Sequence, residues 1–435
     1  MQSSLLVYAV ATSLALLATV IMIPASTNLW WMLHAWRTPE VYESIAGPPP
    51  AGAGATSFSA IVPFRHEREE VVRATVERLV NQTHDDVEVV LSVGHDDPES
   101  VAMAERLAAE WPQQVLVSID TSEQKSKPRQ LNTALRSCTR EYVSIFDAES
   151  LAHPELFAHA EAKLAGGRYQ VVQAGVQLVN HRTTWFALRN CMEYFFWFRS
   201  RLHLHARHGF IPLGGNTVFV QRSLIEDFGG WDERCLTEDC DLGVRLSARG
   251  VEVGVVYDPR LVTREESPDS VSAMVRQRSR WNQGFLQVLA KGDWRALPRR
   301  GQRLLARYTL VQPYFQALIF LTLPIAVAAS IGANLPLPFT MLTFLPLVPT
   351  VGTVLLEGAA LNEFGRDLGL KIGVRDYVVL VASTLPYQAL LGYAALRGMV
   401  RHWRGREDWE KTPHTGHHLS ATHPAVAAAA EAGAA

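Results

Sequence analysis

The segment YVSIFDAE, from Tyr142 to Glu149, carries the strongest indication of fold in this 435-residue sequence. Its first five residues are mostly apolar and have the length of a buried strand. They run directly into Asp147 and Glu149, whose i, i+2 spacing lets both carboxylates reach one hard cation, such as Mg²⁺ or Mn²⁺. A solvated turn is the competing interpretation, because other acidic pairs, such as Asp239 and Asp241, have the same spacing.

Short apolar runs alternate with amphipathic segments on both sides of this stretch. We expect strands at residues 58–63, 87–93, 115–119, 142–146, 171–178, 217–220 and 251–257. Apolar periodicity predicts helices at residues 69–79, 99–110, 130–136, 239–249 and 271–289. This alternation indicates an α/β domain with a mainly parallel sheet, in which ligands bind beyond the carboxyl ends of the strands.

Long apolar stretches flank the α/β region. Residues 5–23 contain no charged side chain, and Trp30, Trp31 and Trp36 precede Arg37, as expected where a membrane span ends. A cleaved signal peptide fits less well, because no lysine or arginine precedes this long run. Three further apolar stretches follow the α/β region, at residues 308–334, 337–356 and 377–396.

We therefore divide the chain into six parts. They are an N-terminal membrane helix (1–37), a linker (38–56), the α/β domain (57–291), a basic interfacial segment (292–307), membrane and interfacial helices (308–397) and a C-terminal tail (398–435). Residues 358–375 are amphipathic and are expected in the membrane interface. The topology stays open: three spans after a cytosolic domain place the tail outside, whereas its arginines favour an inside tail.

Composition excludes one class of partner and favours another. Hydrophobic residues make up 48% of the chain and charged residues 19%, which is typical of a protein that is part soluble and part membrane. The net charge of -2 gives no basic footprint for nucleic acid. Arg299, Arg300, Arg303 and Arg307 cluster just before an apolar stretch, so membrane lipids are the expected partner there. The four cysteines form no CxxC pair and are expected to be reduced thiols.

The segment Thr237-Glu238-Asp239 opens one of the predicted helices. Thr237 could cap this helix, and acids in a first turn suit the helix dipole. Asp239 could instead act as a general base, if a substrate hydroxyl lies within hydrogen-bonding distance. Position alone does not separate these two interpretations.

Gln277, Arg280 and Trp281 share one face of a predicted helix, at i, i+3 and i+4. Tryptophan offers a flat platform for a sugar ring or base, and arginine can bind a diphosphate through two hydrogen bonds. The alternative is an interfacial helix whose basic residues contact lipid headgroups.

The order of these motifs resembles glycosyltransferase family 2: a DxD-like pair, then Thr-Glu-Asp, then Gln-x-x-Arg-Trp, then apolar spans. The chain is most similar to the membrane-embedded branch of cellulose-synthase-like and hyaluronan- or chitin-synthase-like enzymes. The resemblance covers about residues 57–290 by motif. It implies a GT-A type nucleotide-sugar domain, with a mainly parallel sheet and flanking helices, inserted between transmembrane helices.

The resemblance also implies roles for individual residues. Contacts to the nucleotide-sugar or its diphosphate are implied for Pro63, Glu67, Asp96, Asp97, Lys127, Asn132, Asp147, Gln277, Arg280 and Trp281. Asp147 and Glu149 would bind Mg²⁺ or Mn²⁺, and Asp239 would be the catalytic base, with Glu238 beside it. Acceptor contacts are implied for Gly214, Gly215, Asn216 and Trp281.

Two departures from the family pattern leave assignments open. Gly-His-Asp-Asp at 94–97 replaces the usual DDGS, so Asp96 and Asp97 are both candidates for the nucleobase contact. The C-terminal segment 409–416 resembles the FxVTxK gating loop only loosely, through Trp409, Lys411, Thr412 and His414. A gating loop would require a cytosolic tail.

The implied reaction is an inverting transfer from a UDP-sugar, or a GDP-sugar, to a growing β-linked polysaccharide. The expected location is the cell membrane, with several spans, a cytosolic catalytic domain and an export partner of unknown identity. Transfer of one sugar to a lipid acceptor is an alternative. A catalytically inactive scaffold or transport component is a second alternative, disfavoured because Asp147, Glu149 and Asp239 are all present.

Overall fold

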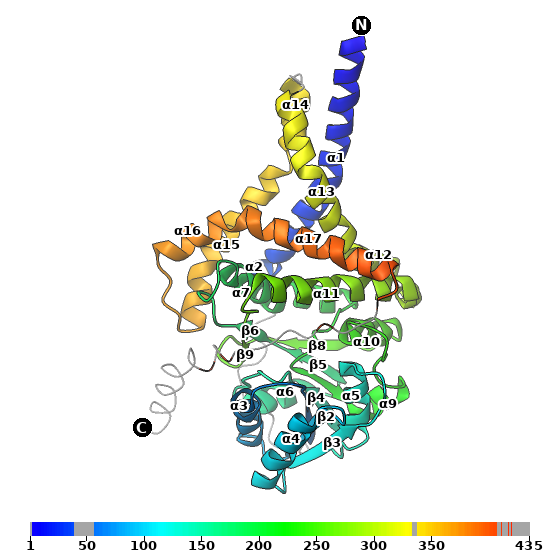
Figure 1. The fold of residues 1–435 in the computed structure, drawn as a ribbon, viewed down its shortest axis with the longest axis vertical. Coiled ribbons are helices and arrows are strands. Elements are labelled where there is room, and N and C mark those ends of the chain that lie inside the picture. Colours follow the sequence, from blue (N-terminus) through cyan, green and yellow to red (C-terminus); the bar gives the residue numbers. More distant parts are fainter. Residues whose placement is uncertain are drawn as a thin grey trace.

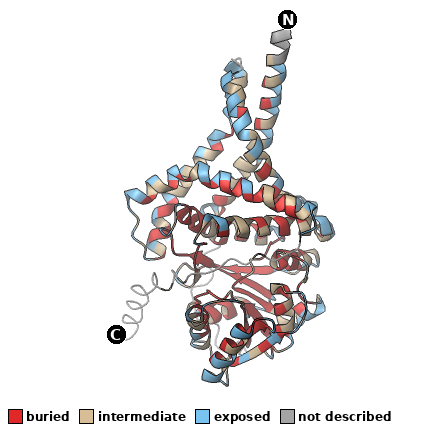
Figure 2. Cartoon of the chain, viewed as in Figure 1, coloured by how far each residue is buried: buried red, intermediate tan, exposed pale blue. Residues whose placement is uncertain are grey.

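The computed structural model describes residues 2–38, 56–332, 337–406, 410, 416 and 419. Figure 1 shows an α/β domain at one end, long helices projecting from the other, and a layer of helices between them. In Figure 2 the sheet is buried, whereas the projecting helices expose much of their surface. Helices that expose apolar side chains in this way are suited to a lipid environment.

A seven-stranded sheet forms the centre of the α/β domain, in the order β3-β2-β1-β4-β7-β5-β8. β1 pairs in parallel with β2 and β4, so the carboxyl ends of these strands meet at one edge. β7 runs antiparallel to both of its neighbours, β4 and β5. The predicted α/β class with a mainly parallel sheet is confirmed. The strands are β1 (Phe58–Pro63), β2 (Val87–Gly94), β3 (Val115–Asp120), β4 (Tyr142–Ile145), β5 (Val171–Ala174), β7 (Val218–Gln221) and β8 (Val253–Val256).

The expectation of a single strand over residues 171–178 is wrong. The chain leaves the main sheet at Gly175, and β6 (Val176–Leu178) pairs with β9 (Thr263–Glu265) in a second, two-stranded sheet. A side chain at Gly175 would lie 2.9 Å from the ring of Tyr257, so glycine permits the close approach at this break. β9 is not predicted from the sequence, because three residues are too few for a periodic signal.

Helices cover both faces of the sheet (Figure 1). Successive residues of β1 belong to different clusters of buried side chains: Ala60 and Val62 to one, Ile61 to the other. This is the pattern of a strand buried on both faces. The helices of the domain are α3 (Glu69–Val80), α4 (Pro98–Glu110), α5 (Lys127–Leu135), α6 (Leu156–Leu164), α7 (Ala187–Phe196), a π-helix (Trp197–Arg201), α8 (Leu202–His208), α9 (Arg222–Asp227) and α10 (Glu238–Ala248).

A helical layer separates the sheet from the projecting helices. α11 (Val271–Lys291) lies against the domain, and α17 (Thr384–Trp403) packs along it (Figure 1). The two backbones approach closely at Gly398, where a Cβ would lie 2.7 Å from the carbonyl oxygen of Ser279. The Ser279 hydroxyl donates to the Ala394 carbonyl at 3.0 Å. α11 therefore connects the domain to the C-terminal helices.

Ion pairs fix the domain to α15 (Leu347–Asp367) and α16 (Val374–Ala382). Residues 358–375 are not one helix, because α15 continues to Asp367 and α16 begins at Val374. Asp367 meets Arg199 of the domain, whereas Arg366, Lys371 and Arg375 are exposed, so the interfacial position of this segment stays a prediction. The pairs are Arg182–Asp376 (2.6 Å), Arg199–Asp367 (2.9 Å) and Arg189–Glu357.

Within the described part of the chain, three helices are long and apolar enough to cross a membrane, or four if one bent pair counts as a span. The third predicted stretch, residues 377–396, belongs to that pair, because α16 and α17 meet at an angle of 46°. Pro386 explains the break, since proline cannot donate to the preceding turn and its ring crowds that turn. The three helices are Val7–Met32 within α1 (Gln2–Met32), Gln312–Gly332 (α13) and Leu337–Asp367, which joins α14 (Leu337–Phe344) to α15.

The contact of α11 with α17 yields a prediction about stability. Gly398→Ala places a methyl group where it would overlap the Ser279 carbonyl, so we expect destabilisation by about 1–3 kcal/mol. The measurement is the unfolding midpoint of the purified protein in detergent, followed by tryptophan fluorescence.

Gly358→Ala is the matched control, because Gly358 lies in α15 with nothing within 4 Å of its added Cβ. Alanine favours helix over glycine by about 1 kcal/mol, so this variant should hold or raise the midpoint. Equal midpoints for the two variants would contradict the close packing of α17 on α11.

Candidate active site

Three carboxylates converge beyond the end of β4. Asp147, Glu149 and Glu265 each offer one oxygen atom, and these atoms lie within 4.8 Å of one another. Glu149 and Glu265 are buried, whereas Asp147 is half-buried. Hard divalent cations bind carboxylate oxygens, so this donor set suits Mg²⁺ or Mn²⁺.

Glu265 is the member of this cluster that sequence analysis does not identify. β9 brings it beside Glu149, because Leu151 and Arg264 exchange two backbone hydrogen bonds of 3.0 Å. The Ser150 hydroxyl donates to Glu265 Oε1 at 2.7 Å, and the same oxygen accepts from Asn216 Nδ2. Asn216, expected at the acceptor, is thus buried and orients a carboxylate instead. The only sequence signal for Glu265 is its place in an acidic pair with Glu266.

A lysine whose side chain is 13% exposed lies among the acidic groups. Lys127, at the start of α5, places its Nζ 2.5 Å from Asp147 Oδ1 and 4.0 Å from Glu238 Oε1. It also donates to the carbonyl of Gly215 at 3.1 Å. Burial alone would lower the pKa of Lys127, but the neighbouring carboxylates raise it above its ordinary value. The positive charge of Lys127 therefore lies between the carboxylate cluster of Asp147, Glu149 and Glu265 and the start of α10.

Glu238 and Asp239 begin α10 on the other side of Lys127. Burial raises the pKa of Asp239 to about 7, and the adjacent Glu238 adds to this rise. Burial also raises the pKa of Glu238, an effect that Lys127 opposes. Gly215 leaves space beside Asp239, because a Cβ there would lie 3.0 Å from Asp239 Oδ2. A carboxyl group that ionises near neutral pH can accept a proton from a hydroxyl.

α11 closes the site next to α10. A side chain at Gly284 would overlap Thr237, so this glycine lets the Thr-Glu-Asp turn pack directly on α11. From the same helix, the positive charge of Arg280 acts to lower the pKa of Glu238. Gln277 Oε1 is buried and has no hydrogen-bond partner among the described residues.

Trp281 carries a cation on its ring face. The guanidinium carbon of Arg278 lies 4.5 Å from the centroid of the Trp281 ring, which is cation–π geometry. Arg278 in turn lies 2.5 Å from Glu193 of α7, whose carboxylate also accepts from the hydroxyl of Tyr387 at 2.7 Å. Sequence analysis does not single out Arg278, which joins the Trp281 platform to α7 and α17.

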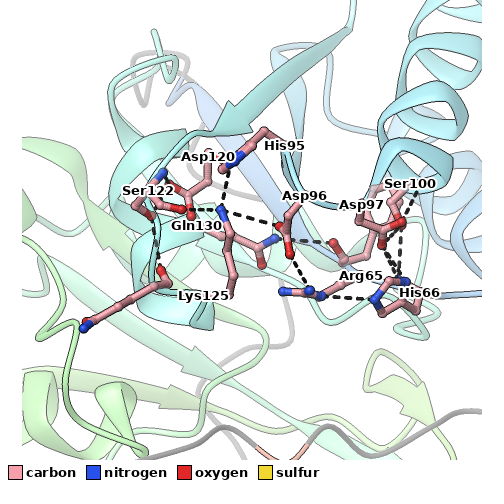
Figure 3. A network of polar contacts seen from close by, with 12 residues as sticks. Arg65, His66, His95, Asp96, Asp97, Ser100, Asp120, Ser122, Lys125 and Gln130 are labelled. Atoms are coloured by element: carbon pink, nitrogen blue, oxygen red, sulfur yellow. Dashed lines mark hydrogen bonds and ion pairs between the residues drawn. The ribbon is translucent and has the colours of Figure 1, made fainter.

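The carboxyl ends of β1, β2 and β3 form a separate polar network, drawn in Figure 3. Asp97 is engaged inside the protein: it caps α4 through Ser100 N at 3.2 Å and accepts from His66 N at 2.8 Å. Asp96 points into the cluster instead, where it pairs with Arg65 and with Lys125 at 3.5 Å. The structure therefore separates the two candidate aspartates, and Asp96 is the one with access to a ligand.

Four other predicted residues lie nearby in different settings. Pro63 ends β1, and Glu67 lies in the turn that follows it. The side-chain amide of Asn132 is bonded to the backbone of Trp231. It donates to Trp231 O and accepts from Trp231 N, both at 2.9 Å. Trp231, together with Gly214, Asp239 and Glu238, lines a small cavity beside the base. Trp231 is a further residue that sequence analysis does not select.

The segment expected to act as a gating loop lies almost entirely outside the described residues, including Trp409, Lys411, Thr412 and His414. Near it, Glu410 pairs with Arg397 at 2.6 Å and with Arg401 at 3.1 Å. The Gly416 amide donates to Glu266 Oε1 at 3.1 Å, and Glu266 directly follows Glu265 of the carboxylate cluster. Parts of the tail thus contact the domain on the side of the carboxylate cluster.

Comparison with known proteins agrees with this geometry. The model of the family described as "Glycosyltransferase like family 2" matches residues 55–284. A beta-monoglucosyldiacylglycerol synthase of Synechocystis sp. is 24% identical over 221 residues, which cover 50% of this chain and 46% of that protein. A probable glucomannan 4-beta-mannosyltransferase 2 of Oryza sativa is 26% identical over 177 residues, covering 40% of this chain and 30% of the relative. The chain thus spans about half or less of the length of these relatives.

A solved structure shares the fold. The mannosyltransferase PcManGT from Pyrobaculum calidifontis, in complex with GDP-Man and Mn²⁺, superposes with a TM-score of 0.61. It is 20% identical, and the superposition covers 91% of this chain and 100% of that chain. At this identity the likeness shows the fold alone. Because residues 55–284, more than half of the chain, match the family, this protein is a glycosyltransferase that belongs to glycosyltransferase family 2.

Proposed function

We propose that this protein is an inverting, metal-dependent glycosyltransferase that transfers a sugar from a nucleotide-sugar to an acceptor hydroxyl at the membrane. The observation that carries the proposal is that Asp239 and Lys127 lie close to the carboxylate cluster, which consists of Asp147, Glu149 and Glu265. A carboxyl group whose pKa is about 7 lies within electrostatic reach of the Lys127 ammonium group, which contacts Asp147 of a carboxylate cluster suited to a cation. These are the parts that a transfer from a diphosphate donor needs.

Each charged group has one role in this reaction. Asp239 accepts the proton of the acceptor hydroxyl as that oxygen attacks the anomeric carbon from the face opposite the diphosphate. An α-linked donor then gives a β-linked product. Lys127 and Arg280 stabilise the negative charge that develops on the leaving diphosphate. A divalent cation held by Asp147, Glu149 and Glu265 would neutralise more of that charge.

The polar network around Asp96, where we place the nucleobase, favours a UDP-sugar as the donor. The imide edge of uracil presents one N–H between two carbonyl oxygens. The carboxylate of Asp96, which lies between the cationic groups of Arg65 and Lys125, offers the complementary acceptor between two donors. A GDP-sugar is the second candidate, because the structurally similar PcManGT binds GDP-Man.

The acceptor is a growing β-linked glycan or a membrane lipid. The glycan is supported by the Gln277, Arg280 and Trp281 motif and by a relative named as a glucomannan mannosyltransferase. The lipid is supported by a relative named as a glucosyldiacylglycerol synthase. The size of the product distinguishes these acceptors.

We place the catalytic domain on the cytosolic side of the cell membrane. With α1, α13 and the α14–α15 unit as spans, and α16 and α17 against the domain, the tail returns to the cytosol. This arrangement agrees with the four arginines between 397 and 406, which favour an inside tail. It also lets the 409–416 segment reach the active site.

The first prediction concerns the base. Asp239→Asn preserves shape but cannot accept a proton, so we expect transfer to fall by roughly 10³-fold or more, while nucleotide affinity is retained. Release of free nucleotide diphosphate, with Mn²⁺ and a panel of UDP- and GDP-sugars, measures transfer, and calorimetry measures affinity. Asp227→Asn, an exposed acid of α9, is the control and should leave both unchanged. Full turnover by Asp239→Asn would remove this residue as the base.

The second prediction is a pH profile. Only the ionised carboxylate of Asp239 can accept a proton, and its pKa is about 7. We therefore expect kcat/KM to fall as the pH drops below about 7 and to level off above it. A rate that is flat down to the ordinary range of an aspartate would show that the pKa is not raised in the working enzyme.

The third prediction concerns the cation. Treatment with EDTA should abolish release of the nucleotide diphosphate, and Mn²⁺ or Mg²⁺ should restore it. Glu265→Gln weakens the donor set but keeps the side-chain shape, so it should raise the Mn²⁺ concentration for half-maximal rate by roughly 10-fold or more. Glu252→Gln, at an exposed position outside the cluster, serves as control. Activity that survives EDTA would refute the assignment of the metal.

A further inference from the structure

α12 (Arg300–Leu310) is docked on the catalytic domain by one face only. Gln302, Ala306 and Leu310 are buried on that face, and Gln302 Nε2 donates to the carbonyl of Gly209 at 3.0 Å. Ala306 and Leu310 belong to a cluster of buried side chains with Phe210. These contacts fix the rotation of the helix about its axis, so the direction of its opposite face is fixed as well.

The opposite face combines three arginines with one leucine. Arg300, Arg303, Leu304 and Arg307 recur at intervals of three or four residues, so they share one side of the helix. Arg300 and Arg307 are exposed, Arg303 is half-buried, and Leu304 is 68% exposed. We call these four residues the arginine face. An exposed leucine among arginines is unusual for a face that contacts water alone.

The arginine face has no internal counter-charge. Among the described residues, no carboxylate forms an ion pair with Arg300, Arg303 or Arg307. By contrast, Arg189 and Arg199, at the contact between the domain and α15, both meet carboxylates. The positive charges of these three guanidinium groups are therefore not neutralised by a carboxylate of the described residues, and they can attract an anionic partner.

The arginine face lies at the level where the candidate spans leave the domain. α13 begins at Gln312, directly after α12. The Trp31 ring, at the end of α1, lies 5.4 Å from the ring of Tyr308 of α12. The guanidinium of Arg37 covers Trp30 at 3.4 Å, a pairing suited to a membrane boundary. Figure 1 shows α12 beside the helical layer, between the sheet and the projecting helices.

We propose that the arginine face binds the phosphate groups of anionic phospholipids in the cytosolic leaflet, with Leu304 inserted among the acyl chains. The inference rests on the membrane position proposed above. Guanidinium groups bind phosphate oxygens through paired hydrogen bonds. Each basic residue close to an anionic surface strengthens the attraction by roughly fivefold, so three of them select anionic over zwitterionic headgroups. Such binding holds α11 and the active site at a set height above the membrane.

The test uses the full chain with Leu304→Cys carrying an environment-sensitive fluorophore. The four native cysteines are buried, so the label goes to the new site. The protein is placed in phosphatidylcholine nanodiscs that contain a minor fraction of phosphatidylglycerol. A nitroxide quencher near the glycerol backbone is carried either by phosphatidylglycerol or by phosphatidylcholine, at equal amounts.

We expect the phosphatidylglycerol-borne quencher to act roughly fivefold or more strongly than the phosphatidylcholine-borne one, and this ratio to fall at high salt. Adding Arg300→Gln, Arg303→Gln and Arg307→Gln to the labelled chain should bring the ratio to about one. The control removes the same charge from exposed arginines of the domain, through Arg136→Gln, Arg168→Gln and Arg260→Gln, and should keep the ratio.

Equal quenching by both lipids would overturn the proposal, since the face would then contact membrane without selecting anionic headgroups. Quenching by neither lipid would overturn it as well, because Leu304 would then lie away from the bilayer. Release of nucleotide diphosphate is measured on the same nanodiscs. Loss of release with an intact quenching ratio counts against the catalytic proposal alone, so the two failures are distinguishable.

Discussion

The ammonium group of Lys127 is the interaction on which the site depends, because it balances carboxylates that the fold brings together. Its Nζ lies 2.5 Å from Asp147, which is half-buried, and 4.0 Å from Glu238, which is buried and has little water to solvate it. Without a cation at this point, the acidic groups at the end of β4 and the start of α10 would repel one another in a poorly solvated pocket. Asp147 follows β4 and Lys127 follows β3, and both strands run in the same direction within one sheet, so the two residues lie at the same edge. A positive group already present there also prepares the pocket for a diphosphate.

α11 links this pocket to the membrane side of the molecule. One part of the helix carries Arg280, whose positive charge acts on Glu238 of the site, and another part packs against α17 at Gly398. Arg278 ties both parts to α7, through Glu193, which is also bonded to Tyr387 of α17. The candidate site and the C-terminal helices therefore both contact one helix, α11.

Ion pairs between the domain and α15–α16 serve the same end by a different route. Arg182, Arg189 and Arg199 each meet a carboxylate of those helices, and such pairs specify orientation more than they add stability. The arginine face of α12 differs, because its charges have no partner within the described part of the chain. The paired arginines thus orient α15 and α16 against the domain, whereas Arg300 and Arg307 of the arginine face are exposed.

The sequence by itself determined the α/β class, most strand and helix positions, and the grouping of motifs that places the chain in its family. These features follow from local periodicity and from acids placed directly after apolar runs, which a linear reading detects. Only the tertiary structure decided that Glu265 joins Asp147 and Glu149, because β9 is too short to predict and its partner strand is distant in the chain. The tertiary structure also distinguished Asp96 from Asp97. Asp97 caps α4 because the backbone N–H of His66, in the turn after β1, donates to its carboxylate, and the sequence does not report this contact. The bend between α16 and α17 likewise became evident only in three dimensions, because hydropathy reports apolar length but not the direction in which a helix runs.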